Sequence, residues 1–179
     1  MPLAPDFYTA EMVRALPEDG KRYEVVHGEL AVTPSPRWGH QAVVPPLIAA
    51  LVGYCQRYGV GRVMSAPADI SWSPDTLVQP DVFVIAPQEA NVGEWSAVRS
   101  LSLVAEVLSP STAGFDRFQK RRLYQAQGVA AIWLIDVDRR TVEVWTPAAL
   151  VPTIETERIA WLPAGALEPL IIEFSALFA

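Results

Sequence analysis

The sequence has only one cysteine and two lysines among its 179 residues. The lone Cys55 excludes an internal disulfide framework and a zinc site built from cysteines, so we expect a reducing, cytoplasmic environment. Long apolar runs are missing too: the longest, Ala42 to Cys55, has 14 residues, whereas a membrane span needs about 20. The first residues contain Asp6 and Glu11 and no basic stretch followed by an apolar one. We therefore expect no signal peptide and no membrane partner.

Basic residues are outnumbered by acidic ones, with 14 lysines and arginines against 20 aspartates and glutamates, and the formal net charge is −6. That charge argues against a protein that coats nucleic acid through electrostatics alone. One segment differs, because residues 114–140 hold six basic side chains against three acidic ones. Arg117, Arg121 and Arg122 in this segment are candidates to bind DNA phosphates. The simpler interpretation of the same arginines is a solvated helix face.

Apolar residues are abundant, at 51% of the chain against 19% charged residues. This composition excludes a disordered protein. The length suits one domain over residues 1–179, because a chain of this size can bury about 70% of the surface it exposes when unfolded.

Hydrophobic periodicity, glycines and prolines predict the order of the elements. We expect helices over residues 9–16, 46–58 and 115–127, with Pro46 as the first helical residue of the second because Pro45–Pro46 should interrupt any earlier start. We expect strands at 22–27, 29–33, 62–65, 69–72, 78–86, 101–108, 131–137 and 141–145. A hairpin (153–157 with 159–162) and a short helix should close the chain. Several strands are apolar on both faces, which is typical of a central sheet covered by helices. The fold class is therefore α/β, with antiparallel hairpins at its edge.

Two carboxylates stand inside these apolar strands. Asp81 lies in Val-Gln-Pro-Asp-Val-Phe-Val, and Glu106 lies in Leu-Val-Ala-Glu-Val-Leu. A buried ionised carboxylate is unfavourable unless it is paired, protonated or bound to a metal. One such acid is commonly part of a structural ion pair. Two acids on neighbouring strands about 4.8 Å apart indicate a site that needs a cation.

Lys120 is the lysine that could approach this pair. It follows the Glu106 strand and shares a helix face with Asp116, Leu123 and Tyr124, so that face is at least partly inward. The alternative is a surface ion pair between Lys120 and Asp116. Two carboxylates and a nearby lysine suit Mg²⁺-assisted (or Mn²⁺-assisted) phosphodiester hydrolysis, in which Asp81 and Glu106 would bind the metal.

These residues resemble the Uma-two family of restriction endonucleases, within the PD-(D/E)XK nuclease superfamily. The resemblance covers about residues 23–145. It rests on an ordered series of motifs: Tyr-Glu-Val-Val-His-Gly-Glu-Leu (23–30), Pro-Ser-Pro followed by His40, Gln-Pro-Asp-Val (79–82), Glu-Val-Leu-Ser-Pro-Ser-Thr (106–112), Asp116, Lys120, Tyr124, and Gly-Val…Trp-Leu-Ile-Asp (128–136).

The resemblance implies a restriction endonuclease-like mixed central sheet flanked by helices, with an N-terminal β-hairpin. It matches Pro80–Asp81 to the PD element and Glu106 to the acid of the (D/E)XK element. Leu108 stands where that element has its lysine, and the family's lysine is placed on the following helix, at Lys120.

Further positions follow from the same resemblance. Glu24 and Glu29 match the acids of the hairpin, and the sequence leaves open which of them faces the metal. His40 is a candidate catalytic residue in a loop whose direction is open. His27 departs from the family, which often has aspartate there, and is expected on the surface.

The first hypothesis is that the protein is a metal-dependent endonuclease that hydrolyses DNA as a homodimer. The dimer is expected by analogy, because paired sites can cut both strands. The candidate catalytic residues are Asp81, Glu106, Lys120, Glu24 and His40. The alternative is a non-catalytic, degenerate nuclease that binds protein or DNA, in which the acids survive as an ion-pair network.

Overall fold

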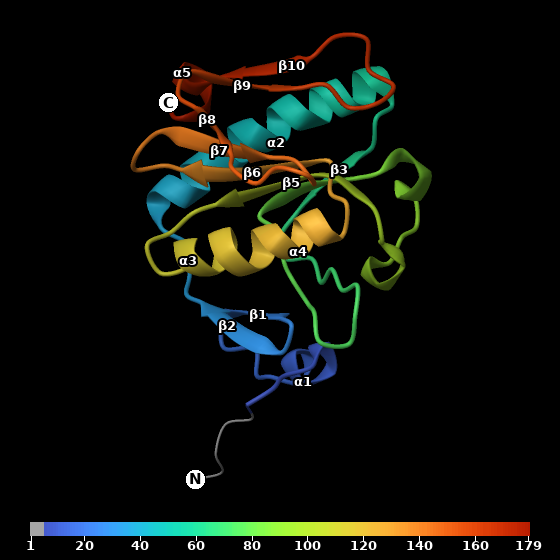
Figure 1. The fold of residues 1–179 in the computed structure, drawn as a ribbon, viewed down its shortest axis with the longest axis vertical. Coiled ribbons are helices and arrows are strands. Elements are labelled where there is room, and N and C mark those ends of the chain that lie inside the picture. The colour runs from blue at the N-terminus through green and yellow to red at the C-terminus, as the bar shows by residue number, and fades with distance from the viewer. Residues whose placement is uncertain (1–5) are drawn as a thin grey trace.

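The computed structural model describes residues 6–179, and its centre is a six-stranded mixed sheet (Figure 1). In spatial order the strands are β3 (Arg62–Ser65), β4 (Val82–Ile85), β5 (Leu101–Val107), β6 (Ala131–Asp136), β7 (Thr141–Trp145) and β8 (Thr153–Glu155). Only β5 and β6 are parallel within this sheet, and the other neighbours are antiparallel. The parallel pair needs a crossover, which a helix between the two strands supplies. The predicted α/β class with a mixed central sheet is confirmed.

Helices cover both faces of the sheet. The long helix α2 (Trp38–Tyr58) lies on one face, and β9 (Arg158–Trp161), β10 (Leu170–Glu173) and α5 (Phe174–Leu177) pack over it (Figure 1). The opposite face carries the crossover, a continuous helical segment made of α3 (Ala113–Phe115), the π turn η3 (Asp116–Lys120) and α4 (Arg121–Ala126). Two short 3-10 helices, η1 (Pro87–Glu89) and η2 (Trp95–Ala97), connect β4 to β5. We call residues 113–126 the crossover helix.

Strand alternation divides the core between the two faces. Residues on one face of the strands, such as Val84 and Leu103, pack against α2. Their neighbours Phe83 and Val104 lie on the other face and pack against the crossover helix. Glu106 is two residues after Val104 on β5, so its side chain projects from the same face, toward the crossover helix. The sheet thus places one carboxylate on the helix-covered face.

The N-terminal part is a short helix and a hairpin beyond the crossover helix (Figure 1). Helix α1 (Ala10–Arg14) begins after Thr9, whose hydroxyl accepts a hydrogen bond from the Met12 amide as predicted for an N-cap. The hairpin consists of β1 (Arg22–Val26) and β2 (Glu29–Thr33), as predicted from the sequence. Its two turn residues, His27 and Gly28, both have positive φ, which is the conformation of a type I′ turn.

Gly28→Ala is expected to lower the free energy of unfolding by about 1–3 kcal/mol. A Cβ at this position would lie 2.2 Å from the Phe7 ring, and φ is +82°, so the substitution adds a clash to backbone strain. Gly53→Ala is the matched control, because it lies inside α2 with no atom within 4 Å of the added Cβ. There alanine should stabilise the helix. Denaturant unfolding measures both, and equal effects would contradict the tight packing of Phe7 on the turn.

The prediction that α2 starts at Pro46 is wrong. The helix begins at Trp38 and continues through Pro45 and Pro46 to Tyr58, and Gly59 ends it in the left-handed conformation, as expected. Each proline removes a hydrogen bond to the residue four positions earlier, and those residues, Gln41 and Ala42, are exposed. Their carbonyl groups can therefore bind water, and burial of the opposite face of α2 holds the helix together.

Four further expectations differ from the structure. Residues 69–72 form only an isolated bridge between Ile70 and Val78, and the predicted strand 78–86 is shortened to β4. The expected pairing of 153–157 with 159–162 does not form, since β8 pairs with β7 and β9 pairs with β10. The predicted regular helix 115–127 contains a π turn, a feature frequent at functional sites.

Within residues 6–179, none of the helices is both long and apolar enough to cross a membrane.

Candidate active site

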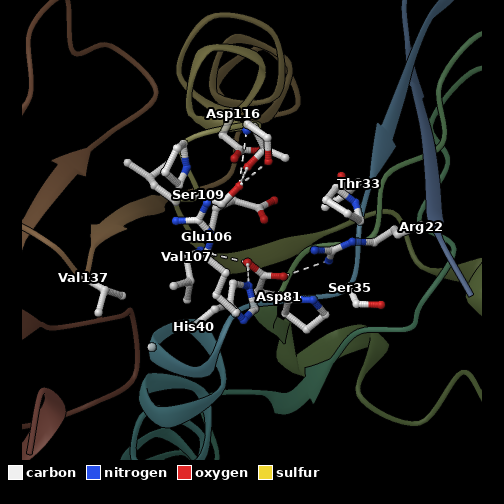
Figure 2. A pocket seen from close by; sticks show the side chains of 18 of the residues that line it. Arg22, Thr33, Ser35, His40, Asp81, Glu106, Val107, Ser109, Asp116 and Val137 are labelled. Atoms are coloured by element: carbon white, nitrogen blue, oxygen red, sulfur yellow. Dashed lines mark hydrogen bonds and ion pairs between the residues drawn. The ribbon is translucent and has the colours of Figure 1, made fainter.

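Charged side chains gather in a cavity of about 320 Å³ between the hairpin, the start of α2 and the crossover helix (Figure 2). We call it the acidic cavity, and define it by its charged lining at the base: Arg22, Glu24, His40, Asp81, Glu106, Asp116 and Lys120. Burial of such groups is unusual, because charged residues are rarely fully buried unless paired. Apart from Thr76, every buried polar or charged residue of the described chain lines this cavity. The fold therefore gathers the buried charged side chains of the described residues at a single cavity.

Sheet register brings the two predicted carboxylates together. Val82 pairs with Ala105 in the antiparallel ladder of β4 and β5, so Asp81, one residue before, comes opposite Glu106. The Val107 amide donates a hydrogen bond of 2.8 Å to Asp81 Oδ2, which fixes the carboxylate at the edge of the ladder. The expected adjacency of these acids is therefore present in the fold.

Lys120 lies at the centre of the buried charges. Its side chain is 1% exposed, and its Nζ is 2.7 Å from Glu106 Oε1 and 2.8 Å from Glu24 Oε1. Asp116 Oδ1 is 3.7 Å away. Burial alone would lower the pKa of Lys120, but the surrounding carboxylates, led by Glu106 and Glu24, raise it above its ordinary value. Lys120 therefore stays charged, and it is not the surface partner of Asp116 that the alternative interpretation had.

Glu24, not Glu29, faces the acidic cavity. Besides Lys120, Glu24 Oε1 accepts a hydrogen bond of 2.7 Å from the Gln79 amide. Glu29 is exposed and accepts a hydrogen bond from the Gln119 side chain outside the cavity. The question that the sequence left open between the two hairpin acids is thereby answered in geometric terms.

Asp81 is held by two cationic or donor side chains. Arg22 Nη1 lies 2.8 Å from Oδ1, and His40 Nε2 lies 3.0 Å from Oδ2 (Figure 2). Because an ionised carboxylate can only accept, Nε2 of His40 carries the proton of this hydrogen bond. Burial alone would raise the pKa of Asp81, but the His40 hydrogen bond and the Arg22 charge lower it well below its usual range. Asp81 is therefore ionised at physiological pH.

Glu106 has the opposite electrostatic environment. Burial raises the pKa of Glu106 to about 8, although the charge of Lys120 opposes this rise. The Tyr124 hydroxyl donates a hydrogen bond of 2.5 Å to Oε1, and the pKa of Asp116 is also raised, first by burial. Burial therefore favours the neutral form of Glu106, and the charge of Lys120 favours the ionised form. The acidic cavity thus has more carboxylates than positive charges.

The direction of His40 follows from the corrected start of α2. Because the helix begins at Trp38, His40 stands in its first turn and points to Asp81 rather than lying in a loop. His27, by contrast, is an exposed turn residue 3.9 Å from Asp75, as expected from its place in the hairpin.

The predicted DNA-binding arginines lie outside the acidic cavity. Arg117 pairs with Glu143 at 2.6 Å, and Arg121 donates to Gln125 and stacks 4.3 Å above the Trp145 ring. Arg122 is exposed. Two of the three guanidinium groups therefore serve internal contacts, and a role for these arginines in binding DNA stays a prediction.

Sequence reasoning missed Arg22 and the contact of Tyr124 with Glu106. Arg22 precedes Glu24 by two positions on β1, so strand alternation puts both side chains on one face. Once Glu24 was a candidate, its spacing from Arg22 was a pattern that could have indicated Arg22 as well. Tyr124 shares a helix face with Lys120, and its hydroxyl needed a buried partner.

The carboxylates of the acidic cavity are oxygen ligands of the kind that Mg²⁺ and Mn²⁺ take in proteins. The whole lining of the cavity holds five carboxylates (Glu24, Asp81, Glu106, Asp116 and Asp138) and three permanently charged cations (Arg22, Arg37 and Lys120). The raised pKa of Glu106 comes first from burial and then from the neighbouring carboxylates, led by Asp81. Among residues 6–179 there is no cluster of three or more histidine, cysteine or acidic side chains arranged to hold a metal. Magnesium often takes only one or two carboxylates and completes its shell with water and substrate phosphates. Asp81 and Glu106 satisfy that requirement.

Comparison with known proteins agrees with the fold and the motifs. A crystal structure of a nuclease from Anabaena variabilis, described as putative and belonging to DUF820, superposes with a TM-score of 0.76 at 21% identity. The match covers 96% of this chain and 97% of that one. No curated protein matches the sequence. Residues 10–167 match the Uma2 family, whose description is "Putative restriction endonuclease". The chain is therefore a member of the Uma2 restriction endonuclease family, with a nuclease-like fold.

Proposed function

We propose that this protein is a metal-dependent endonuclease that hydrolyses DNA phosphodiester bonds. The observation that carries the proposal is the placement of Lys120 between Glu24 and Glu106, at a cavity that also holds the ionised Asp81. Burying one ammonium and several carboxylates together is costly for stability alone. A site that must neutralise a reacting phosphate gives a reason to keep them.

Asp81 and Glu106 would hold the metal ion. Each has unused acceptor capacity: Asp81 Oδ1 accepts one hydrogen bond, from Arg22, and both described contacts of the Glu106 carboxylate are to Oε1. When bound, Mg²⁺ supplies a Lewis acid and lowers the pKa of bound water. A bound metal would also favour the ionised form of Glu106, against the effect of burial.

The side chains of the cavity would hold the carboxylate of Asp81 in place and neutralise charge on the reacting phosphate. Lys120 carries a fixed positive charge at the cavity base, where it would stabilise negative charge that develops on the phosphate. Glu24 holds the Lys120 ammonium in place. Arg22 and His40 hold Asp81 from two sides, so that its carboxylate needs little reorganisation before a ligand binds.

Supercoiled plasmid with Mg²⁺ or Mn²⁺ tests the proposal. Wild-type protein should nick the plasmid, and Glu106→Gln or Asp81→Asn should lower the rate by a factor of about 10²–10³ or more. Glu29→Gln is the matched control, because it removes a hairpin acid that lies outside the acidic cavity. Its rate should equal that of the wild type.

The rival function is a non-catalytic binding module. It is favoured by the pairing of Asp81 with Arg22 and His40, which would suit a structural ion-pair network. If the wild type nicks no more than Asp81→Asn with either metal, the nuclease proposal fails and the module replaces it.

We also propose that the nuclease acts as a homodimer, because two acidic cavities are needed to cut both strands of a duplex in one binding event. Sedimentation velocity tests the proposal, and a monomer at working concentration in the presence of DNA would contradict it.

A further inference from the structure

A second hollow adjoins the acidic cavity at the start of α2. It has a volume of about 250 Å³, and its lining includes Trp38, Arg140 and Phe178. Gly39 and Val137 line both spaces, and a Cβ at Gly39 would lie 3.2 Å from Val137 Cγ1. The two spaces therefore share part of their lining. We call the second space the Trp38 hollow.

The Trp38 side chain is unusual in its setting. It is 87% exposed, although an indole normally buries a large apolar area. The flanking Arg37 lines the acidic cavity, and no ion pair or side-chain hydrogen bond joins its guanidinium to another described residue. An exposed aromatic face beside an available guanidinium is the combination that binds a nucleic acid base and its phosphate.

The lining of the hollow itself supplies a positive charge, Arg140. Arg140 Nη2 donates a hydrogen bond of 2.8 Å to the Phe178 carbonyl, and its guanidinium lies 5.7 Å from the Phe178 ring centre. These contacts fix the guanidinium in place and leave its other N–H groups free to donate. Arg140 in the lining of the hollow and Arg37 in the lining of the adjoining acidic cavity are positive charges that complement a phosphodiester backbone.

We infer that the Trp38 hollow binds the nucleotides next to the scissile phosphate in an unpaired strand of DNA. This inference rests on the proposed function, because the acidic cavity defines which phosphate is cut. Stacking on the indole requires an unstacked base, which a single strand, a flap or a frayed end offers and an intact duplex does not. The preferred substrate is thus DNA with a single-stranded segment.

Fluorescence anisotropy with the metal-free protein tests the inference, since no cleavage can then occur. The probes are fluorescein-labelled oligodeoxythymidylate and a blunt-ended duplex. Trp38→Ala should weaken binding of the single strand by about 5- to 100-fold and change duplex binding much less. Trp38→Phe should retain most of the affinity, because it keeps an aromatic face. Leu150→Ala is the control, since Leu150 is 94% exposed and lies outside the hollow.

The outcomes separate this inference from the proposed function. Equal affinities of Trp38→Ala and wild type for the single strand would overturn it, even if the plasmid is nicked. A loss confined to Trp38→Ala supports it, even if no nicking is seen. If Trp38→Ala instead converts a dimer to a monomer in sedimentation velocity, Trp38 is a contact between copies of the chain and the inference is overturned.

Discussion

Lys120→Met is expected to lower the free energy of unfolding by about 3–5 kcal/mol, the cost typical of breaking a buried ion pair by removing one partner. Methionine is similar in volume but leaves Glu24 and Glu106 buried without their shared ammonium. For a chain of this size, such a loss should lower the Tm by roughly 6–20 °C. Thermal unfolding followed by circular dichroism, in buffer without divalent metal, measures the change.

The sequence offers a matched control, because its other lysine has the opposite environment. Lys21 is half-exposed and pairs with Asp19 at the surface, so Lys21→Met should leave the Tm nearly unchanged. The double variant Lys120→Met with Glu106→Gln should recover part of the loss, because it removes one of the stranded carboxylates. If both lysine variants unfold at the same temperature, the central position of Lys120 in the charge cluster is wrong.

Asp81→Asn and Glu106→Gln are expected to act alike on metal binding. Each removes a proposed metal ligand, and loss of even an indirect partner of a metal commonly costs 10- to 100-fold in affinity. Titration calorimetry with Mn²⁺ should therefore show a decrease of at least about tenfold in both variants. Unchanged affinity in both would remove Asp81 and Glu106 from the metal site.

The same two variants are expected to differ in stability without metal. Asp81→Asn leaves the Arg22 guanidinium without its carboxylate, so the free energy of unfolding should fall by about 1–3 kcal/mol. Glu106→Gln should cost little or stabilise, because glutamine resembles the neutral carboxyl group that burial favours at Glu106. Denaturant unfolding in EDTA measures both. Equal losses would contradict the contrasting electrostatic environments of the two acids.

From the sequence alone, relief of repulsion between two acids would be expected in both variants, and the structure shows why this argument is incomplete. With two lysines in the chain, a protein cation near Asp81 seemed scarce. The cation is instead a guanidinium, Arg22, from a hairpin that is remote in sequence from β4. Contacts between segments so far apart in the chain leave no pattern in the local sequence around Asp81.

Other parts of the site were predictable because local rules and tertiary packing agree there. Apolar strands around Asp81 and Glu106 fixed their burial and adjacency, and helical spacing placed Lys120 on an inward face. His40 could not be placed, because the steric rule for residues before proline argued for a loop. Packing of α2 between the sheet and β9–β10 outweighs that local preference.

The parallel pairing of β5 with β6 also decides when the site can exist during synthesis. Glu106 stands on β5 and Lys120 stands on the crossover helix. That helix packs on a sheet face to which β6 contributes Ile132 and Leu134. A ribosome-bound chain that ends after Lys120 and before Ala131 contains every proposed catalytic group without β6, one strand of the framework that holds them. Under the proposed function, a chain without β6 should therefore be unable to cut DNA, so assembly of the site is tied to synthesis of the strand that follows the crossover helix.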